Sequence, residues 1–226
     1  MSSPDALIGA LSRIDTPTLS NAIERLKVRS PVNGFADRNL RCIFPDLGVL
    51  CGFAVTAEVE TMNPDEPGRL DQAFFDLCRA IEQSPKPAVV VLQESGPSSE
   101  FCAHCGEVLA TTFKRLGAAG LVSDSGVRDL PEVHAMKFQY FAPGAVASHG
   151  NFRFVRAQVP VTVCGLAISP GDLLHGDSNG LIKVPAQGRE KLPDAAKAVT
   201  EAEKKVMGFI RGESFTLDGL IKMITH

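Results

Sequence analysis

The sequence predicts a layered α/β fold, with sheets covered by helices and further helices at both ends. Three observations support this prediction. Helical and strand-like patterns alternate along the N-terminal half, short strands separated by Gly and Pro occupy residues 140–185, and one amphipathic helix spans residues 194–211. Elements of this kind bury their apolar faces against one another in layers.

The chain is long enough to bury one substantial core, since it has 226 residues and 44% hydrophobic content. No linker-like run, internal repeat or low-complexity tract divides it. We therefore predict a single domain over residues 1–226. It has a helical N-terminal segment over about residues 1–30 and a helical C-terminal tail over about residues 189–226.

Two helices are predicted at the start of the chain. Ser3 and Pro4 can start the first, and the pair Thr16-Pro17 starts a second that ends near Leu26, because proline is favoured in a first helical turn. Apolar residues then alternate with polar or small ones over residues 53–59, which predicts a half-buried strand.

A further alternation of helices and strands follows. Apolar side chains recur at helical spacing over residues 70–82, and the continuous apolar run over residues 88–92 predicts a central strand. Residues 106–116 predict a helix that Gly117 ends, and residues 120–122 predict another buried strand.

The long C-terminal helix is amphipathic. Lysines and glutamates form its solvated face. Its apolar face consists of Ala195, Val199, Ala202, Val206, Phe209 and Ile210.

Charge and composition argue against several function classes. The formal net charge is -3, and the chain has no Trp and one Tyr, so nothing suggests a nucleic-acid surface or a base-stacking platform. The N-terminus lacks the basic and continuous apolar regions of a signal peptide, and no apolar run reaches the roughly 18 residues of a membrane span. We expect a cytoplasmic protein that binds neither nucleic acid nor membranes.

Six cysteines include the pair in the segment Cys102-Ala103-His104-Cys105. This pair lacks the second ligand pair of a structural zinc site and the strand-then-helix setting of a redox motif. We expect free, partly buried thiols, because no secretory signal is present. Oxidation of these thiols would disturb the neighbouring Gly106 and Glu107.

The residues most indicative of function are Glu107 and the adjacent pair Arg128-Asp129, which are separated by twenty residues. An arginine binds a carboxylate bidentately, and a carboxylate oxygen suits a hard ion such as Mg²⁺. Glu107 is predicted near a helix N-terminus, where backbone N–H groups can hold an anion. Two purely structural interpretations stay open: the Arg-Asp pair can cap a helix, and Glu107 can stabilise the helix dipole.

Several further segments resemble one known family. They are DTPTLSNA at residues 15–22, GFAVTA at residues 52–57 and PGDLLHGDSNG at residues 170–180. Together with the spacing of Glu107 and Arg128-Asp129, they resemble the family of regulator of ribonuclease activity A and the 4-hydroxy-4-methyl-2-oxoglutarate (HMG) aldolases. Asn21 departs from the pattern, since Asp is more usual there.

The resemblance implies a fold, an assembly and a site. The fold is a swivelling β/β/α sandwich of the RraA-like type, assembled as a homotrimer or homohexamer. Asp129 would anchor Mg²⁺ or Mn²⁺, and Glu107 would activate a water molecule as acid or base, with Arg128 as the second catalytic residue. The positions implied to bind a small 2-oxo acid substrate are Gly106, Glu107, Val108, Leu109 and Arg128.

The activity implied by the resemblance is that of a metal-dependent (class II) aldolase. It would cleave HMG-type 2-oxo diacids to release pyruvate, with oxaloacetate decarboxylation as a side activity. The alternative is a non-catalytic regulator that binds ribonuclease E, although an acidic residue at position 107 favours the enzyme. A methyltransferase function has little support, because no strand is followed by the glycine-rich turn and acidic residue of a nucleotide-type cofactor site.

Three other polar residues near these motifs remain open. Glu132 comes three residues after Asp129, so a helix there would put both on one face, where Glu132 can support the metal or be solvated. His175 and Asp177 resemble metal ligands, but a strand–turn role is the preferred interpretation for His175, and Asp177 is left as possible support for the metal.

Overall fold

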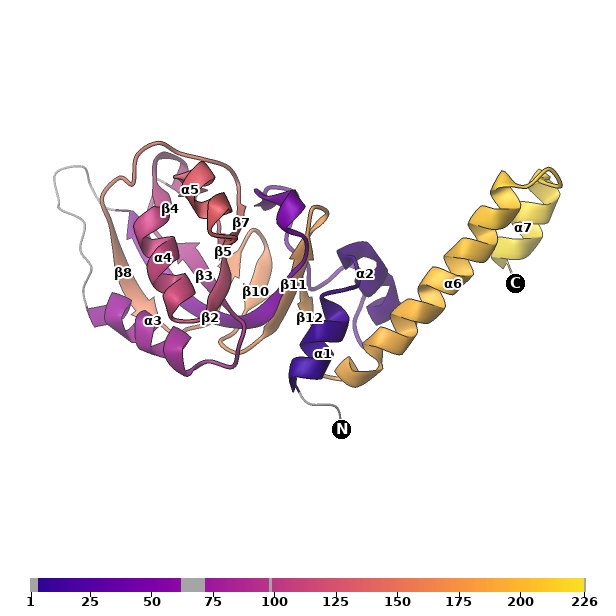
Figure 1. Cartoon of the computed structure of the whole chain (residues 1–226), viewed down its shortest axis with the longest axis horizontal. Coiled ribbons are helices and arrows are strands. Elements are labelled where there is room, and N and C mark those ends of the chain that lie inside the picture. The colour runs from indigo at the N-terminus through magenta and orange to yellow at the C-terminus, as the bar shows by residue number, and fades with distance from the viewer. Residues whose placement is uncertain (1–3, 62–71, 98, 226) are drawn as a thin grey trace.

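An eight-stranded mixed sheet lies at the centre of the structure, a computed structural model that describes residues 4–61, 72–97 and 99–225 (Figure 1). The strand order is β1-β7-β5-β3-β2-β11-β12, and β8 pairs with the C-terminal part of β2. Neighbours among β2, β3, β5 and β7 are parallel, and the other pairs are antiparallel. The strands are β1 (Arg41–Cys42), β2 (Leu50–Thr61), β3 (Ala88–Glu94), β5 (Ala118–Ser123), β7 (Gln139–Ala142), β8 (Phe152–Ala157), β11 (Leu173–Asp177) and β12 (Gly180–Val184).

Two small strand pairs lie outside this sheet. β4 (Ala103–Cys105) pairs parallel with β6 (Gly126–Val127), and β9 (Val161–Val163) pairs antiparallel with β10 (Leu166–Ile168). The strands β7 to β12 fill the region where short strands were predicted.

The central strands are buried on both faces. Residues 88–92 of β3 are completely inaccessible to solvent, as the predicted central strand requires. For β2 the prediction of a half-buried strand is wrong over most of its length, because Ala54 and Thr56 are buried as well. The pair β9–β10 covers this second face. Partly exposed Glu58 and Glu60 begin to alternate with buried residues only where β2 pairs with β8.

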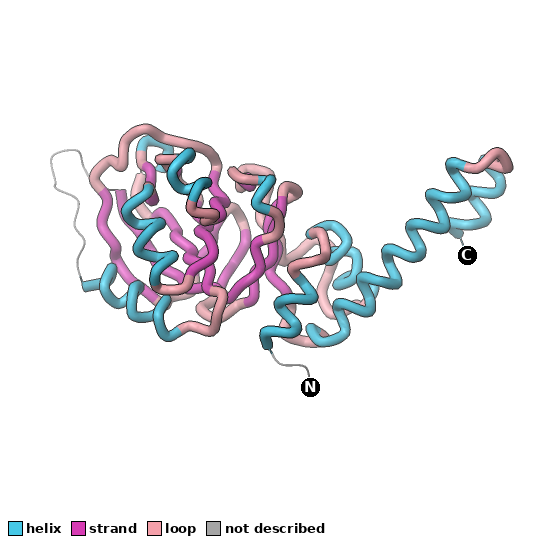
Figure 2. Tube along the Cα trace, viewed as in Figure 1, coloured by secondary structure: helices cyan, strands magenta, loops and turns pink. Residues whose placement is uncertain are grey.

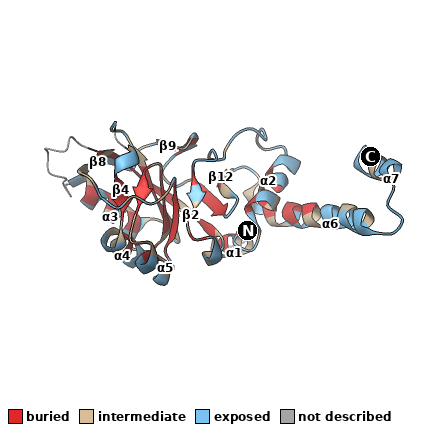
Figure 3. Ribbon diagram, turned by 90° about the horizontal axis from the view of Figure 1, so that it is seen from above, coloured by how far each residue is buried: buried red, intermediate tan, exposed pale blue. Residues whose placement is uncertain are grey.

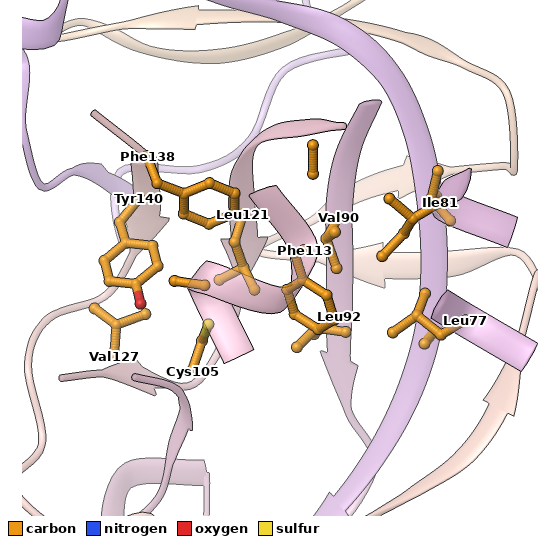
Figure 4. Packing of buried hydrophobic residues seen from close by; sticks show 14 of the residues in the cluster. Leu77, Ile81, Val90, Leu92, Cys105, Phe113, Leu121, Val127, Phe138 and Tyr140 are labelled. Carbon is orange, nitrogen blue, oxygen red and sulfur yellow. The ribbon is translucent and has the colours of Figure 1, made fainter. Parts of the chain in front are cut away.

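Three helices cover one face of the sheet (Figures 1 and 2). Leu77, Ile81 and Phe113 pack there with Val90 and Leu92 of β3 (Figure 4). These helices confirm the helical patterns in the described part of residues 70–82 and in residues 106–116. They are α3 (Gln72–Gln83), α4 (Glu107–Arg115) and α5 (Leu130–Ala135).

The opposite face of the sheet packs against the strand pair β9–β10. Val161, Val163, Leu166 and Ile168 are buried there with Val89 and Val91 of β3 among other residues. Helices, central sheet and strand pair therefore form three layers, as the sandwich architecture requires.

A third cluster of buried residues joins the N-terminal helices to the start of α6 and to the sheet edge at β11 and β12. The second helix begins as predicted, with Pro17 in its first turn and Asp15 as its N-cap, where Oδ1 accepts a hydrogen bond from the backbone N–H of Thr18 at 2.9 Å. Asn21 donates a hydrogen bond from Nδ2 to Oε1 of Glu203 on α6 at 3.2 Å. The helices are α1 (Pro4–Leu11), α2 (Thr16–Arg25) and α6 (Leu192–Arg211).

The outer half of α6 extends away from the body as an arm, and α7 (Leu217–Thr225) folds back along its end (Figure 1). Only the first part of the predicted apolar face of α6 is buried, at Ala195 and Val199. Beyond residue 200 the helix is largely exposed (Figure 3). The exposed large apolar side chains of the arm are Met207, Ile210, Phe215, Leu217, Ile221, Met223 and Ile224.

His175 and Asp177 hold the N-terminal helices to strand β11. His175 is completely buried, with Nδ1 at 3.1 Å from Oγ1 of Thr16 and Nε2 at 3.2 Å from the carbonyl oxygen of Leu11. Asp177 accepts a hydrogen bond from the backbone N–H of Thr16 at 2.7 Å. Both side chains are engaged in joining the helices to the sheet, which supports the strand–turn interpretation for His175.

Candidate functional site

The strand pair β4–β6 brings together two segments that are distant in sequence. Ala103 is paired with Gly126, and Cys105 with Val127. The carbonyl oxygen of Cys105 also accepts a hydrogen bond from the N–H of Arg128 at 2.9 Å. Since α4 starts just after β4, the pairing places the first turn of α4 beside Arg128-Asp129.

The carboxylate of Asp129 forms a hydrogen bond with the first turn of α4. Its Oδ2 accepts a hydrogen bond from the backbone N–H of Glu107 at 2.8 Å. Asp129 occupies the N-cap position of α5 in a left-handed conformation, at φ 56° and ψ 45°, and makes no side-chain capping bond to that helix. The carboxylate of Asp129 therefore does not cap α5, the helix that follows it, but accepts a first-turn N–H of α4. Aspartate is one of the few non-glycine residues that adopt this conformation readily, so the backbone can turn here without a glycine.

Gly106 leaves the space that this contact needs. A Cβ atom at this position would lie 2.3 Å from Oδ2 of Asp129 and 2.9 Å from Nε of Arg128. Such distances are far below van der Waals contact, so any side chain here would displace the carboxylate. The site therefore depends on a glycine at the N-cap of α4.

Arg128 lies beside the same carboxylate. Its Nε is 3.6 Å from Oδ2 of Asp129, and the two side chains are 37% and 35% exposed. Both line a cleft of about 290 Å³. Because the guanidinium of Arg128 is partly exposed, it can still bind an anionic ligand. In a fully buried ion pair, the hydrogen-bond donors of the arginine would all be used by its partner.

The remaining wall of the cleft is mostly apolar. Besides Arg128 and Asp129, it is lined by Ala103, His104, Gly106, Val108, Leu109, His149, Gly150 and Phe152. Of the residues implied by the family resemblance, Gly106, Val108, Leu109, Arg128 and Asp129 therefore lie together.

The exposed side chain of Glu107 does not belong to the residues that line the cleft, although its backbone N–H binds Asp129. Glu132 is also exposed on α5 and does not line the cleft. The structure thus brings the backbone of Glu107, but not its carboxylate, to the cleft.

Sequence patterns did not indicate His104, Glu94, His149 and Phe152. His104 lines the cleft, and its Nε2 lies 2.8 Å from Oε2 of the nearly inaccessible Glu94. An acidic residue two positions after the buried run of residues 88–92 was the available signal for Glu94. His104 lies within the CxxC segment, and no local sequence pattern distinguishes it from a structural histidine.

All six cysteines are free thiols, as expected. Cys102 and Cys105 are completely buried, more than predicted, and Sγ of Cys102 donates a hydrogen bond to the carbonyl oxygen of His149 at 2.8 Å. Burial raises the pKa of Cys102 to about 11 and that of Cys105 to about 12. Both therefore remain protonated near neutral pH, and Cys105 packs beside Val127 and Tyr140 (Figure 4).

Two further features bear on the kind of site. Within residues 4–61, 72–97 and 99–225, no three side chains of His, Cys, Asp or Glu gather as a metal-binding group. In the same described ranges, no helix has the length and apolar character needed to cross a membrane.

Comparison with known proteins identifies relatives of this chain. A family model described as RraA-like, Aldolase/RraA, matches residues 16–183. Protein DlpA of Legionella pneumophila is 26% identical over 136 residues, which cover 59% of this chain but only 22% of DlpA. The chain thus spans less than a quarter of that relative.

One further relative and one solved structure match over most of their length. A Deinococcus radiodurans protein named "Putative 4-hydroxy-4-methyl-2-oxoglutarate aldolase" is 28% identical over 178 residues, which cover 77% of this chain and 96% of that protein. The crystal structure of Streptomyces coelicolor RraAS2, described as an unusual member of the RNase ES inhibitor RraA family, superposes with a TM-score of 0.69 at 24% identity. It covers 91% of this chain and 97% of RraAS2. The RraA-like fold is confirmed, and the chain belongs to the Aldolase/RraA family.

Proposed function

We propose that this protein is a divalent-metal-dependent lyase that cleaves 2-oxo acids of the HMG type and releases pyruvate, with oxaloacetate decarboxylation as a second reaction at the same site. The observation that carries the proposal is the convergence of Arg128, Asp129 and the first turn of α4 on one cleft. Relatives named as aldolases supply the reaction class.

The residues present suit a hard divalent cation at Asp129. The known hydrogen bond of this carboxylate engages Oδ2, and within the described residues Oδ1 accepts none. One carboxylate is enough for Mg²⁺, which keeps most of its water shell and takes one or two protein carboxylates. When bound, Mg²⁺ or Mn²⁺ would act as a Lewis acid toward the 2-oxo group.

Arg128 would bind the substrate's carboxylate. Carbon–carbon cleavage next to a ketone leaves an enolate, and the guanidinium beside Asp129 would offset part of that negative charge. The first N–H groups of a helix have no partner within the helix, so the first turn of α4 can hold the same carboxylate at Val108 and Leu109. Gly106 allows the substrate to approach this backbone closely.

Glu107 is proposed to move a proton during the reaction. Its carboxylate is exposed at the first turn of α4, directly beside residues that line the cleft. A rotation about its side-chain bonds would be needed to reach a substrate or water in the cleft. Its backbone role toward Asp129 does not depend on this movement.

The protein is also proposed to form a homo-oligomer, a trimer or a hexamer. The apolar side chains exposed along the arm of α6 and α7 support this assembly, because contiguous exposed apolar surface usually marks an interface. Figure 3 shows how little of the arm is covered by its own chain.

The decisive experiment is a pyruvate-release assay with several 2-oxo acids, before and after exhaustive chelation. We expect activity that EDTA abolishes and that added Mg²⁺ or Mn²⁺ restores. Full activity after chelation would exclude the metal-dependent mechanism. No pyruvate from any HMG-type acid or oxaloacetate, with metal present, would favour the alternative of a protein-binding regulator.

A further inference from the structure

The strand pair β4–β6 determines how the two halves of the site meet. β4 leads directly into Gly106 and α4, whereas β6 leads directly into Arg128 and Asp129. Neither strand belongs to the central sheet. An interaction that holds β4 against the central sheet therefore also positions the residues proposed to bind the metal and the substrate.

His104, in the middle of β4, joins this strand to the central sheet. Its side chain is completely buried. Nε2 lies 2.8 Å from Oε2 of Glu94, the last residue of β3, and Nδ1 lies 3.0 Å from Oγ of Ser123, the last residue of β5. One imidazole thus connects β4 to the carboxyl ends of two neighbouring sheet strands.

The carboxylate of Glu94 is itself firmly held. Oε1 accepts hydrogen bonds from the backbone N–H groups of Thr61 at 2.8 Å and of Gly96 at 2.6 Å, and Oε2 accepts one from the hydroxyl of Thr61. Burial opposes ionisation of Glu94, but the hydrogen bonds from His104 and Thr61 outweigh it and lower the pKa to about 2. Glu94 is therefore a fixed anionic acceptor for a proton on Nε2 of His104.

The second nitrogen of His104 has a matching partner. The hydroxyl oxygen of Ser123 already accepts a hydrogen bond from the backbone N–H of Ser125 at 3.0 Å, so its own proton can go to Nδ1 of His104. Both ring nitrogens are thus engaged away from the cleft. The ring lies near Phe152, another residue of the cleft wall, at a centroid distance of 5.8 Å.

We propose that His104 is a positioning residue, which acts through β4 to hold the first turn of α4 against Arg128 and Asp129. This proposal deepens the proposed function, on which its catalytic part rests. His104 does not exchange a proton with the substrate. Its two hydrogen bonds instead keep the Glu107 N–H and the Asp129 carboxylate at bonding distance.

Four variants of the full-length protein separate this role from ordinary stabilisation. His104→Phe keeps a planar ring and removes both hydrogen bonds. His104→Gln can retain a donor near the Nε2 position, and His104→Asn can retain a polar group near Nδ1. The matched control is His175→Phe, because His175 is equally buried and also uses both nitrogens, but joins α1 and α2 to β11.

Three measurements are made on each folded variant: Mn²⁺ affinity by electron paramagnetic resonance, kcat and KM for pyruvate release, and hydrogen exchange of residues 103–110 and 126–129. We expect His104→Phe to weaken Mn²⁺ binding and kcat/KM by about tenfold or more, as is typical when a group supporting a metal site is lost. Exchange should accelerate in both segments. His104→Gln should recover most of each loss, because it keeps the bond to ionised Glu94. His175→Phe should lower the midpoint of thermal unfolding without these effects.

The two proposals can fail separately. If the wild-type protein neither binds Mn²⁺ nor releases pyruvate, the lyase proposal is wrong, and hydrogen exchange still decides the role of His104. Unchanged exchange in residues 103–110 and 126–129 of His104→Phe would refute the positioning role. Equal losses in His104→Phe and His175→Phe would also refute it, since both would then reflect general destabilisation.

Discussion

The backbone N–H of Glu107 donates a hydrogen bond to Oδ2 of Asp129 at 2.8 Å. This contact spans 22 positions of sequence and joins the start of α4 to the residue before α5. It orients the carboxylate toward the helix start, where the positive end of the helix dipole stabilises negative charge. The first turn of α4 and the Arg128-Asp129 segment therefore hold each other in position.

Replacing Gly106 by alanine should displace the Asp129 carboxylate, because the new methyl group would lie 2.3 Å from Oδ2. We expect Mn²⁺ affinity to fall by about tenfold or more. Isothermal titration calorimetry with Mn²⁺ measures the effect. Gly144→Ala is the control, since a Cβ there meets no atom within 4 Å. Equal affinities for Gly106→Ala and wild type would show that the carboxylate does not need this space.

Arg128→Lys and Asp129→Asn should respond differently to magnesium. Lysine keeps the charge but loses the bidentate fork, so transition-state stabilisation should fall by roughly 3 kcal/mol, and excess Mg²⁺ should not restore it. Asparagine removes the anionic metal ligand, so Asp129→Asn should need a higher Mg²⁺ concentration for activity. Excess Mg²⁺ should restore part of its reaction rate. Rates measured across a Mg²⁺ titration test both. The same Mg²⁺ response in both variants would contradict the assigned roles.

Asp124→Asn should stabilise the protein above pH 6. Burial raises the pKa of Asp124 to about 6 from an ordinary 3.8, although the hydrogen bond from the Glu94 backbone N–H opposes the shift. A raised carboxyl pKa contributes stability that is present below pH 3.8 and lost as pH rises through 6. In urea unfolding, the free energy of unfolding of Asp124→Asn should therefore exceed that of the wild type by a large amount at pH 8 and by less toward pH 5.

The control for this pH dependence is Asp46→Asn. The hydrogen bond with His134 lowers the pKa of Asp46, so its substitution should give no stabilisation at pH 8. A constant difference between Asp124→Asn and wild type from pH 5 to pH 8 would show that Asp124 does not titrate as a buried acid.

Polar substitutions on the arm should reduce the size of the assembly. Leu217, Ile221 and Ile224 are 66%, 49% and 66% exposed and recur at helical spacing on α7. Changing all three to glutamine should leave the body folded and lower the mass found by sedimentation equilibrium. Val32→Gln is the control, because Val32 is 75% exposed outside the arm. An unchanged mass for the triple variant would place the interface elsewhere.

Local sequence patterns predicted most elements of the fold. Proline in a first turn indicated α2, and the apolar run at residues 88–92 indicated the buried strand β3. Local signals determine such elements because capping, turn preferences and apolar periodicity involve residues only a few positions apart. Periodicity failed for β2, where burial of both faces depends on the β9–β10 pair. It also failed for outer α6, where Phe209 packs against Phe215 beyond the helix but Met207 and Ile210 stay exposed.

The sequence by itself determined the chemistry available to this protein: a guanidinium next to a carboxylate after a glycine turn, and a glycine that starts a helix. Only the tertiary structure decided which groups meet. The bond from Glu107 to Asp129 and the link of His104 to Glu94 and Ser123 follow from the pairing of β4 with β6 and from its place over the sheet. Such contacts join residues that are distant in the chain. Their distances are set by strand pairing and packing, which local sequence preferences do not specify.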